Sequence, residues 1–191
     1  MTLSADDRGA LSDLVHRYTA GVDDRRFDAV AELFTVDAEL LVPAPPADLR
    51  PVHTHRGRAA IAAAAAAVAA VARTEHAIVG EVYDAAPPGA ARGRIACVAH
   101  HWSERGDELV DVVWHLRYDD GYQPTGDGWR ISRRALTVNA IETARRAGCC
   151  RTTSPSACAA APSACAAARD PPNPPEVRWQ QICADSQLAP G

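Results

Sequence analysis

The sequence contains no lysine, a single methionine and two phenylalanines among its 191 residues. All 20 basic residues are therefore arginines, and with 24 acidic residues the formal net charge is −4. A mildly acidic chain without a basic patch interleaved with aromatic residues lacks the electrostatic attraction that nucleic acids require. These absences predict that the protein binds no nucleic acid.

Long apolar runs are also missing. The chain has no stretch of about 18 apolar residues, which a membrane-spanning helix would need. Its first ten residues, MTLSADDRGA, are acidic and lack the basic region followed by an apolar region that marks a secretory signal. We therefore expect no membrane partner and a cytoplasmic location.

Cysteine is almost absent from the first 148 residues, where Cys97 stands alone, whereas five cysteines lie further on. The main domain, residues 1–147, is therefore expected to fold without disulfide bonds. Residues 148–191 are of low complexity and contain PSACAAA twice in tandem. With few large apolar side chains to offset the entropy of ordering, this tail is predicted to be disordered. Its composition also suggests an out-of-frame product of a GC-rich gene, a hypothesis that an intact mass of the native protein tests.

Hydrophobic periodicity divides the main domain into helices first and strands afterwards. Apolar residues at helical spacing predict an amphipathic helix over 5–22, and a second short helix carries Phe27, Val30, Leu33 and Phe34. The later part alternates with period two and contains turn residues between its runs. The full set of expected elements is these two helices, a strand at 38–42, a proline-rich loop at 43–51, an alanine-rich helix at about 58–72, and strands at 74–83, 91–104, 109–122 and 127–142.

Three successive hairpins imply a meandering antiparallel sheet, so the predicted fold class is α+β. A curved sheet that wraps the long helix would enclose a cone with one open end. Such a cone is a natural place for a small-molecule site.

Three residues indicate what chemistry could take place in this cone. Asp23 follows the first helix, and His76 and His100 each lie in an apolar, strand-like run. Histidine changes charge near neutral pH, and an adjacent carboxylate can orient its ring and hold its proton. Asp23, His76 and His100 are therefore the candidate catalytic residues. The alternatives stay open: Asp23 as a cap of the next helix, and His76 as a buried neutral histidine bonded to a backbone carbonyl.

Side-chain alternation leaves one choice unresolved. His100 and His101 point to opposite faces of their strand, and both faces are similarly apolar, so only one of the two can face the cone. The remaining candidates for substrate binding are Tyr18, His101, His115, Trp114 and Asn139. For His115 a position on the outer face is the stronger interpretation, and for Trp114 and Asn139 a structural role is an open alternative.

Several phrases, in this order, resemble one known family. They are RYTAGVDDRRFDAVAELFTVDAEL, RGRAAI, TEHAIVG, ACVAHHW, LRYDDGY and GWRISRRAL, and the resemblance covers roughly residues 5–143. Together they are similar to the SnoaL-like branch of the nuclear-transport-factor-2 superfamily. The resemblance implies an α+β, cone-shaped barrel, NTF2-like in architecture, and frequent homo-oligomers.

The resemblance also implies site residues. Dehydratases of that superfamily use an aspartate after the first helix and histidines on the sheet, which fall here on Asp23, His76 and His100. His101 is the competing register for the second histidine, and His100 is chosen because of the resemblance. Tyr18 matches an aromatic residue that lines the pocket in relatives. Scytalone dehydratase has tyrosines that hold a water molecule where this chain has Val22 and about Val42, which is a departure from the dehydratase pattern.

The predicted function is acid–base chemistry, namely dehydration, isomerisation or a related lyase step, on an apolar or polycyclic substrate. The alternative is a non-catalytic module that binds a hydrophobic ligand or stabilises a partner. No cofactor is expected, because the chain has no glycine-rich phosphate loop, and a nucleophile elbow is absent as well. No metal is expected either, because His53 and His55, in the proline-rich region, have no accompanying ligand set.

Overall fold

The computed structural model describes residues 2–105 and 108–147. Helix α1 (Ala5–Asp23) begins at a capping box: the Ser4 hydroxyl accepts a hydrogen bond from the Asp7 backbone N–H at 3.0 Å, and the Asp7 carboxylate accepts one from the Ser4 N–H at 3.0 Å. Its buried side chains, among them Leu11, Val15 and Tyr18, form one stripe, as the periodicity predicts.

The six strands form one sheet in the order β2-β1-β6-β5-β4-β3. Their bounds are β1 Phe34–Ala44, β2 Asp48–Arg56, β3 Arg73–Ala86, β4 Ala90–Arg105, β5 Glu108–Thr125 and β6 Gly128–Ala147. Strands β3 to β6 form the antiparallel meander that the sequence predicts, whereas β1 pairs with β6 in parallel. The sheet is therefore mixed and curved, and its two edge strands do not meet.

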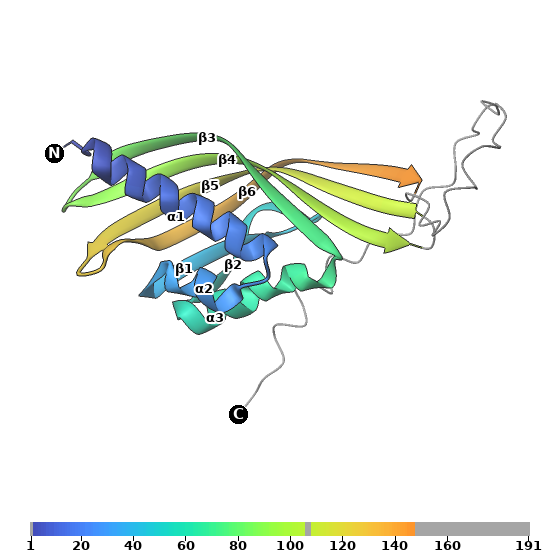
Figure 1. The fold of residues 1–191 in the computed structure, drawn as a ribbon, viewed down its shortest axis with the longest axis horizontal. Coiled ribbons are helices and arrows are strands. Elements are labelled where there is room, and N and C mark those ends of the chain that lie inside the picture. Colours follow the sequence, from blue (N-terminus) through green and yellow to red (C-terminus); the bar gives the residue numbers. More distant parts are fainter. Residues whose placement is uncertain (1, 106–107, 148–191) are drawn as a thin grey trace, which may run out of the picture.

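The helices lie on one side of this sheet (Figure 1). Helix α1 runs across β3 to β5, while α2 (Phe27–Glu32) and α3 (Gly57–Ala65) lie beside β1 and β2. A short 3-10 helix, η1 (Ala66–Ala70), continues α3 toward β3. The alanine-rich segment is thus helical as predicted, although its second half has the tighter 3-10 geometry. The α+β, NTF2-like fold class is confirmed.

Two predicted boundaries are wrong. Residues 43–51 are not one loop, because the chain makes a tight turn and enters β2 at Asp48. Pro51 lies inside that strand, and a proline is tolerated there because β2 is an edge strand. Phe34 does not belong to the second helix but begins β1, where it is fully buried. The low-complexity tail, 148–191, lies outside the described residues.

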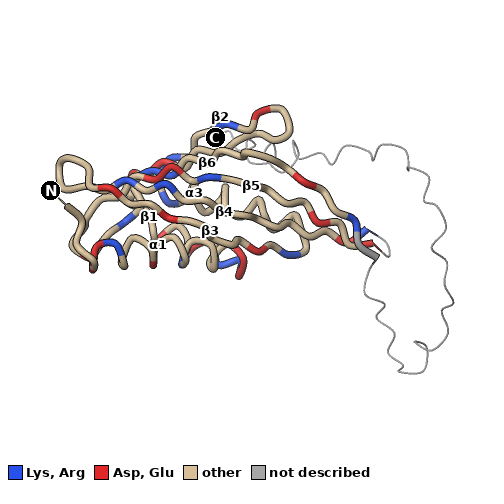
Figure 2. The backbone as a smooth tube through the Cα atoms, turned by 90° about the horizontal axis from the view of Figure 1, so that it is seen from above, with Lys and Arg blue, Asp and Glu red and all other residues tan. Residues whose placement is uncertain are grey.

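Charged residues of both signs are interspersed along the described backbone, with no extended region of one sign (Figure 2). Across residues 2–105 and 108–147, no helix is both long enough and apolar enough to cross a bilayer.

Candidate functional site

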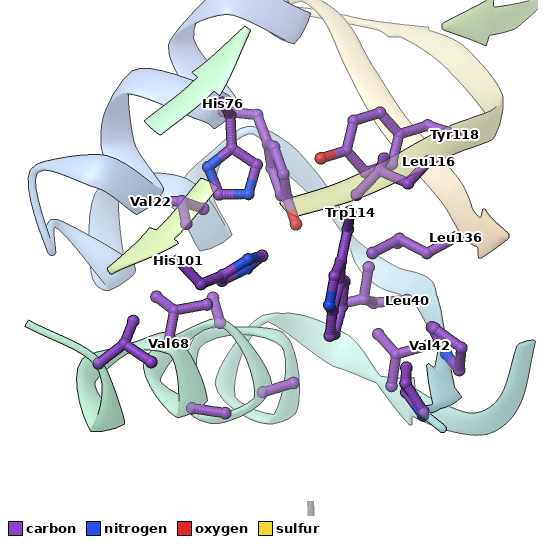
Figure 3. Close-up of a pocket in the computed structure, with 17 residues that line it drawn as sticks. Val22, Leu40, Val42, Val68, His76, His101, Trp114, Leu116, Tyr118 and Leu136 are labelled. Carbon is purple, nitrogen blue, oxygen red and sulfur yellow. The ribbon is translucent and has the colours of Figure 1, made fainter. Parts of the chain in front are cut away.

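A cavity of about 130 Å³ lies between α1, η1 and the concave face of the sheet (Figure 3). Its walls are apolar over most of their area, and they include Val22, Leu40, Val42, Val68, Leu116 and Leu136. Two histidines, a tryptophan and two tyrosines complete the lining: His76, His101, Trp114, Tyr18 and Tyr118. The site therefore combines apolar walls with a few residues that can ionise or form hydrogen bonds.

Asp23 and His76 are in direct contact. One carboxylate oxygen of Asp23 lies 2.7 Å from His76 Nδ1, and the other accepts the His76 backbone N–H at 2.9 Å. Asp23 is the last residue of α1 and His76 lies in β3, so the two elements are joined at this point. The side chains are 21% and 8% exposed, respectively. This is the contact between a carboxylate and an imidazole that the sequence predicts.

The Asp23 carboxyl is held in its ionised form. Burial by itself would raise its pKa, but the hydrogen bonds and charge of His76, with a contribution from Thr74, bring the pKa below its ordinary value. Because an ionised carboxylate only accepts hydrogen bonds, Nδ1 of His76 carries the proton. In the neutral ring, Nε2 then has the lone pair. His76 lines the cavity, so it can act there as a base.

The second histidine of the cavity is His101, and the expectation that His100 faces it is corrected. His101 is 5% exposed and lines the pocket (Figure 3). The strand register gives the reason. Thr74 of β3 pairs with His101, and His76 follows Thr74 by two residues, so both histidines project from the same face. Their ring centroids are 6.1 Å apart.

His101 is an uncharged imidazole. Burial lowers its pKa to about 4, although the carbonyl of Val112 opposes this shift by accepting a hydrogen bond from Nδ1 at 3.1 Å. A carbonyl oxygen has no hydrogen to donate, so Nδ1 is protonated and Nε2 carries the lone pair. The ring also packs against Trp114, with centroids 4.8 Å apart. His101 is therefore a neutral hydrogen-bonding group at neutral pH.

His100 lies on the opposite, outer face of the sheet. Its Nδ1 is 2.9 Å from Asp111, and its ring stacks on Trp102 with centroids 5.1 Å apart and an interplanar angle of 10°. The side chain is 31% exposed. His100 thus has a carboxylate partner of its own, but it does not line the cavity.

Of the remaining predicted substrate-binding residues, two line the cavity and two lie outside it. Tyr18 and Trp114 line the cavity. His115 does not, because it faces outward and contacts Glu142 at 3.2 Å. Asn139 is exposed and sits at the bulge where the pairing of β5 with β6 shifts by one residue. The outer-face position that the sequence favours for His115 is thus the one observed, and neither residue lines this cavity.

His53 and His55 are the residues whose spacing could suit a metal ion. His53 and His55 do lie on one side of a strand, β2, and burial followed by the charge of His53 lowers the pKa of His55. In the part of the chain that the structure describes, no three or more histidine, cysteine, aspartate or glutamate side chains are arranged to hold a metal ion.

The fold and the site together define an NTF2-like protein with an Asp–His contact beside an apolar pocket. The profile of the SnoaL-like domain family matches residues 4–135. The chain belongs to this family. A search among curated proteins finds no match.

Three solved structures illustrate how widely the fold is shared. A putative aromatic ring hydroxylase from Novosphingobium aromaticivorans has 22% identity and a TM-score of 0.63, over 74% of this chain and 96% of the other. A putative scytalone dehydratase from the same organism has 21% identity and a TM-score of 0.60, over 76% and 95%. A hexachlorocyclohexane dehydrochlorinase, LinA type 2, has 18% identity and a TM-score of 0.60, over 74% and 93%. At these identities the likeness shows the fold alone.

Proposed function

We propose that the protein is an enzyme that moves a proton to and from a carbon atom of a small neutral molecule, in a dehydration, an isomerisation or a related elimination. The observation that carries this proposal is the double contact of Asp23 with His76, at 2.7 and 2.9 Å, at the edge of an apolar cavity. A base held in one tautomer by an ionised carboxylate, and shielded from bulk water, is equipment for general acid–base catalysis.

His76 and Asp23 have different roles in this mechanism. His76 takes the proton on Nε2 and later returns it. Asp23 orients the ring through Nδ1 and stabilises the positive charge that His76 acquires. His101 contributes a neutral hydrogen bond to the bound molecule instead of a charge. In this assignment His101, and not the predicted His100, is the second histidine of the site.

The names of two structural relatives support the reaction class. They are a putative scytalone dehydratase and a hexachlorocyclohexane dehydrochlorinase, and both names denote loss of a small molecule from a substrate. The rival function is a non-catalytic ligand-binding module. Apolar walls suit a ligand-binding module as well as they suit an enzyme. A ligand-binding module, however, gives no role to the ionised carboxylate that contacts His76.

Hydrogen–deuterium exchange at carbon tests the proposal without the natural substrate. A carbonyl group acidifies the neighbouring C–H, so we expect the protein to catalyse α-deuteration of small cyclic ketones such as cyclohexanone in D₂O, followed by NMR. His76→Gln should lower the catalysed rate about 10²- to 10⁴-fold, the usual contribution of a general base.

His100→Gln is the matched control, because His100 also contacts a carboxylate but lies outside the cavity. It should retain the wild-type rate. Exchange that persists at full rate in His76→Gln would refute the assignment. Ketones that bind without any catalysed exchange would favour the ligand-binding module.

A further inference from the structure

Helix α1 is followed by a residue with a left-handed backbone. Among the residues that the structure describes, Arg25 is the only one other than glycine with a positive φ, at 60°. The Arg25 N–H donates to the Val22 carbonyl at 3.1 Å. The Arg26 N–H donates to the Gly21 carbonyl at 2.8 Å, and together these two hydrogen bonds form a Schellman motif.

An arginine is an unusual residue for this position. The left-handed residue of a Schellman motif is most often glycine, because a Cβ atom is strained in this conformation. A residue other than glycine persists in such a conformation when its surroundings over-determine it, and many such residues lie beside functional sites. The contacts of the Arg25 side chain are therefore the next observation to consider.

The Arg25 side chain reaches the segment that leads into β3. Its Nη2 donates to the Val71 carbonyl at 3.2 Å, and its Nη1 donates to the Thr74 hydroxyl at 3.2 Å. Val71 follows η1 and lines the cavity, and Thr74 is the second residue of β3. One guanidinium thus joins the end of α1 to the start of β3 at two points.

These hydrogen bonds lie beside the contact between Asp23 and His76. Asp23 precedes Arg25 by two residues, and His76 follows Thr74 by two residues, so both connections join α1 to β3. Residues two apart in a strand project from the same face, so Thr74 and His76 share a face. Because β3 is an edge strand, part of its backbone N–H groups have no neighbouring strand, and that of His76 donates to Asp23 at 2.9 Å.

The Thr74 hydroxyl connects the two contacts, and its residue is 8% exposed. A guanidinium only donates hydrogen bonds, so the hydroxyl oxygen accepts from Arg25 and its own proton is left for another acceptor. The Asp23 carboxylate is that acceptor. Burial raises the pKa of Asp23, whereas hydrogen bonds from His76 and from Thr74 lower it. The carboxylate that contacts His76 is therefore held by Thr74 as well.

We propose that Arg25 and Thr74 are positioning residues for the Asp23–His76 pair. The Arg25 guanidinium fixes the Thr74 hydroxyl and the start of β3, and Thr74 holds the Asp23 carboxylate in the orientation in which it contacts His76. Neither positioning residue lines the cavity, so both act through Asp23. The catalytic consequence of this inference rests on the proposed function.

Replacing Arg25 by glycine removes its side-chain hydrogen bonds and keeps the turn, because glycine suits the left-handed backbone. In the full-length Arg25→Gly protein we expect the backbone amide of His76 to exchange with D₂O about 3- to 10-fold faster, as measured by NMR. An amide of the central strand β5, such as that of Leu116, should exchange as in the wild type. The α-deuteration of cyclohexanone should slow about 3- to 10-fold. Arg25→Asn, which also tolerates this backbone, should behave in the same way.

Arg26→Ala is the matched control. It removes the same charge from the neighbouring residue, whose side chain is 60% exposed and contacts only Asp24, at 2.9 Å, among the described residues. It should leave both rates unchanged. An unchanged His76 amide in Arg25→Gly and Arg25→Asn, or an equal change in Arg26→Ala, would overturn the role of Arg25.

The Thr74 hydroxyl is tested with a pair of substitutions. Thr74→Val keeps the shape of the side chain and removes the hydroxyl, whereas Thr74→Ser keeps the hydroxyl. The pKa of Asp23, followed by NMR of its carboxyl carbon, should rise in Thr74→Val and stay at its wild-type value in Thr74→Ser. A purely structural role of Thr74 would leave this pKa unchanged. A rise in both variants, or in neither, would overturn the role of the hydroxyl.

The double variant tests whether Arg25 acts through Thr74. Arg25→Gly alone should raise the pKa of Asp23, but it should add nothing to the rise that Thr74→Val already causes. Additive effects would show that Arg25 acts on the carboxylate independently of Thr74, which contradicts the proposed connection.

The exchange of the His76 amide and the pKa of Asp23 are measured without any substrate, so the two proposals can fail separately. If the wild type catalyses no α-deuteration, while Arg25→Gly and Thr74→Val change both quantities as expected, the positioning role is supported and the enzyme is refuted. Catalysed α-deuteration that is unaffected by either substitution supports the enzyme and refutes the positioning role.

Discussion

Two Asp–His pairs lie on opposite faces of the same sheet. Asp23 holds Nδ1 of His76 at 2.7 Å on the concave side, and Asp111 holds Nδ1 of His100 at 2.9 Å on the outer side. By contact distance alone the two pairs are nearly equivalent.

The surroundings distinguish them. The concave pair borders an apolar cavity, and its carboxylate also accepts a backbone N–H, so both oxygens are engaged by one histidine. The outer histidine is 31% exposed and stacks on Trp102, and Oδ1 of Asp111 has no hydrogen-bond partner in the described part of the chain. A carboxylate beside an imidazole is therefore not a site by itself, because it needs a space in which a substrate can meet the ring.

Replacing the two carboxylates should give the largest difference between the faces. Asp23→Asn removes the charge that stabilises protonated His76 and permits the wrong tautomer. It should lower the rate of ketone α-exchange by on the order of 10³- to 10⁴-fold, since the Asp→Asn substitution in a Ser–His–Asp triad lowers kcat by about 10⁴-fold. Asp111→Asn should change the rate less than about twofold. Similar losses in the two variants would remove the distinction between the faces.

The pH dependence of stability should distinguish the adjacent histidines. The pKa of His101 falls from 6.5 to about 4 in the folded protein, so between these values the unfolded chain binds more protons. The contribution of neutral His101 to the free energy of unfolding is therefore fully present above pH 6.5. It falls by about 3 kcal/mol as the pH drops to about 4. The contribution of Asp23 is lost at lower pH, because its folded pKa lies below 3.8.

Urea unfolding at several pH values in this window measures the effect. His101→Leu should remove most of the decline, and His100→Leu should retain it. A decline that is unchanged in His101→Leu would show that another group causes it.

The smallest effect is expected for the third carboxylate–histidine contact, His115 with Glu142. Both side chains are largely exposed, at 40% and 70%, and the atoms are 3.2 Å apart. His115→Ala should change the free energy of unfolding by less than about 0.5 kcal/mol and leave α-exchange intact. Chemical denaturation checks this, and a loss above about 1 kcal/mol would mean that the outer face contributes more than its exposure indicates.

The helices and the meander could be predicted because their signals are local. The stripe of α1 and the alternation of β3 to β6 are each contained within a single segment of the sequence. Strand β2 was missed because prolines favour a loop over 43–51, and only the position of β2 at the sheet edge makes Pro51 acceptable. The parallel pairing of β1 with β6 is a long-range contact that periodicity does not reveal.

Part of the site could also be predicted from local signals in the sequence. Asp23 and His76 stand out as polar residues at the end of a helix and within an apolar run. The choice between His100 and His101 depends on which of them shares a face with His76, and that is decided by the pairing of Thr74 with His101. Arg25 was not singled out, because its two hydrogen bonds reach residues 46 and 49 positions further along the chain, and no local signal reveals such contacts.

The most direct test of the central claim is to locate a bound ketone relative to the two Asp–His pairs. Intermolecular nuclear Overhauser effects between the α-protons of cyclohexanone and the histidine Cε1 protons of the full-length protein provide this location, with signals assigned from His76→Gln and His100→Gln. The account predicts contacts with His76 and none with His100. Contacts with His100, or none with His76, would contradict it.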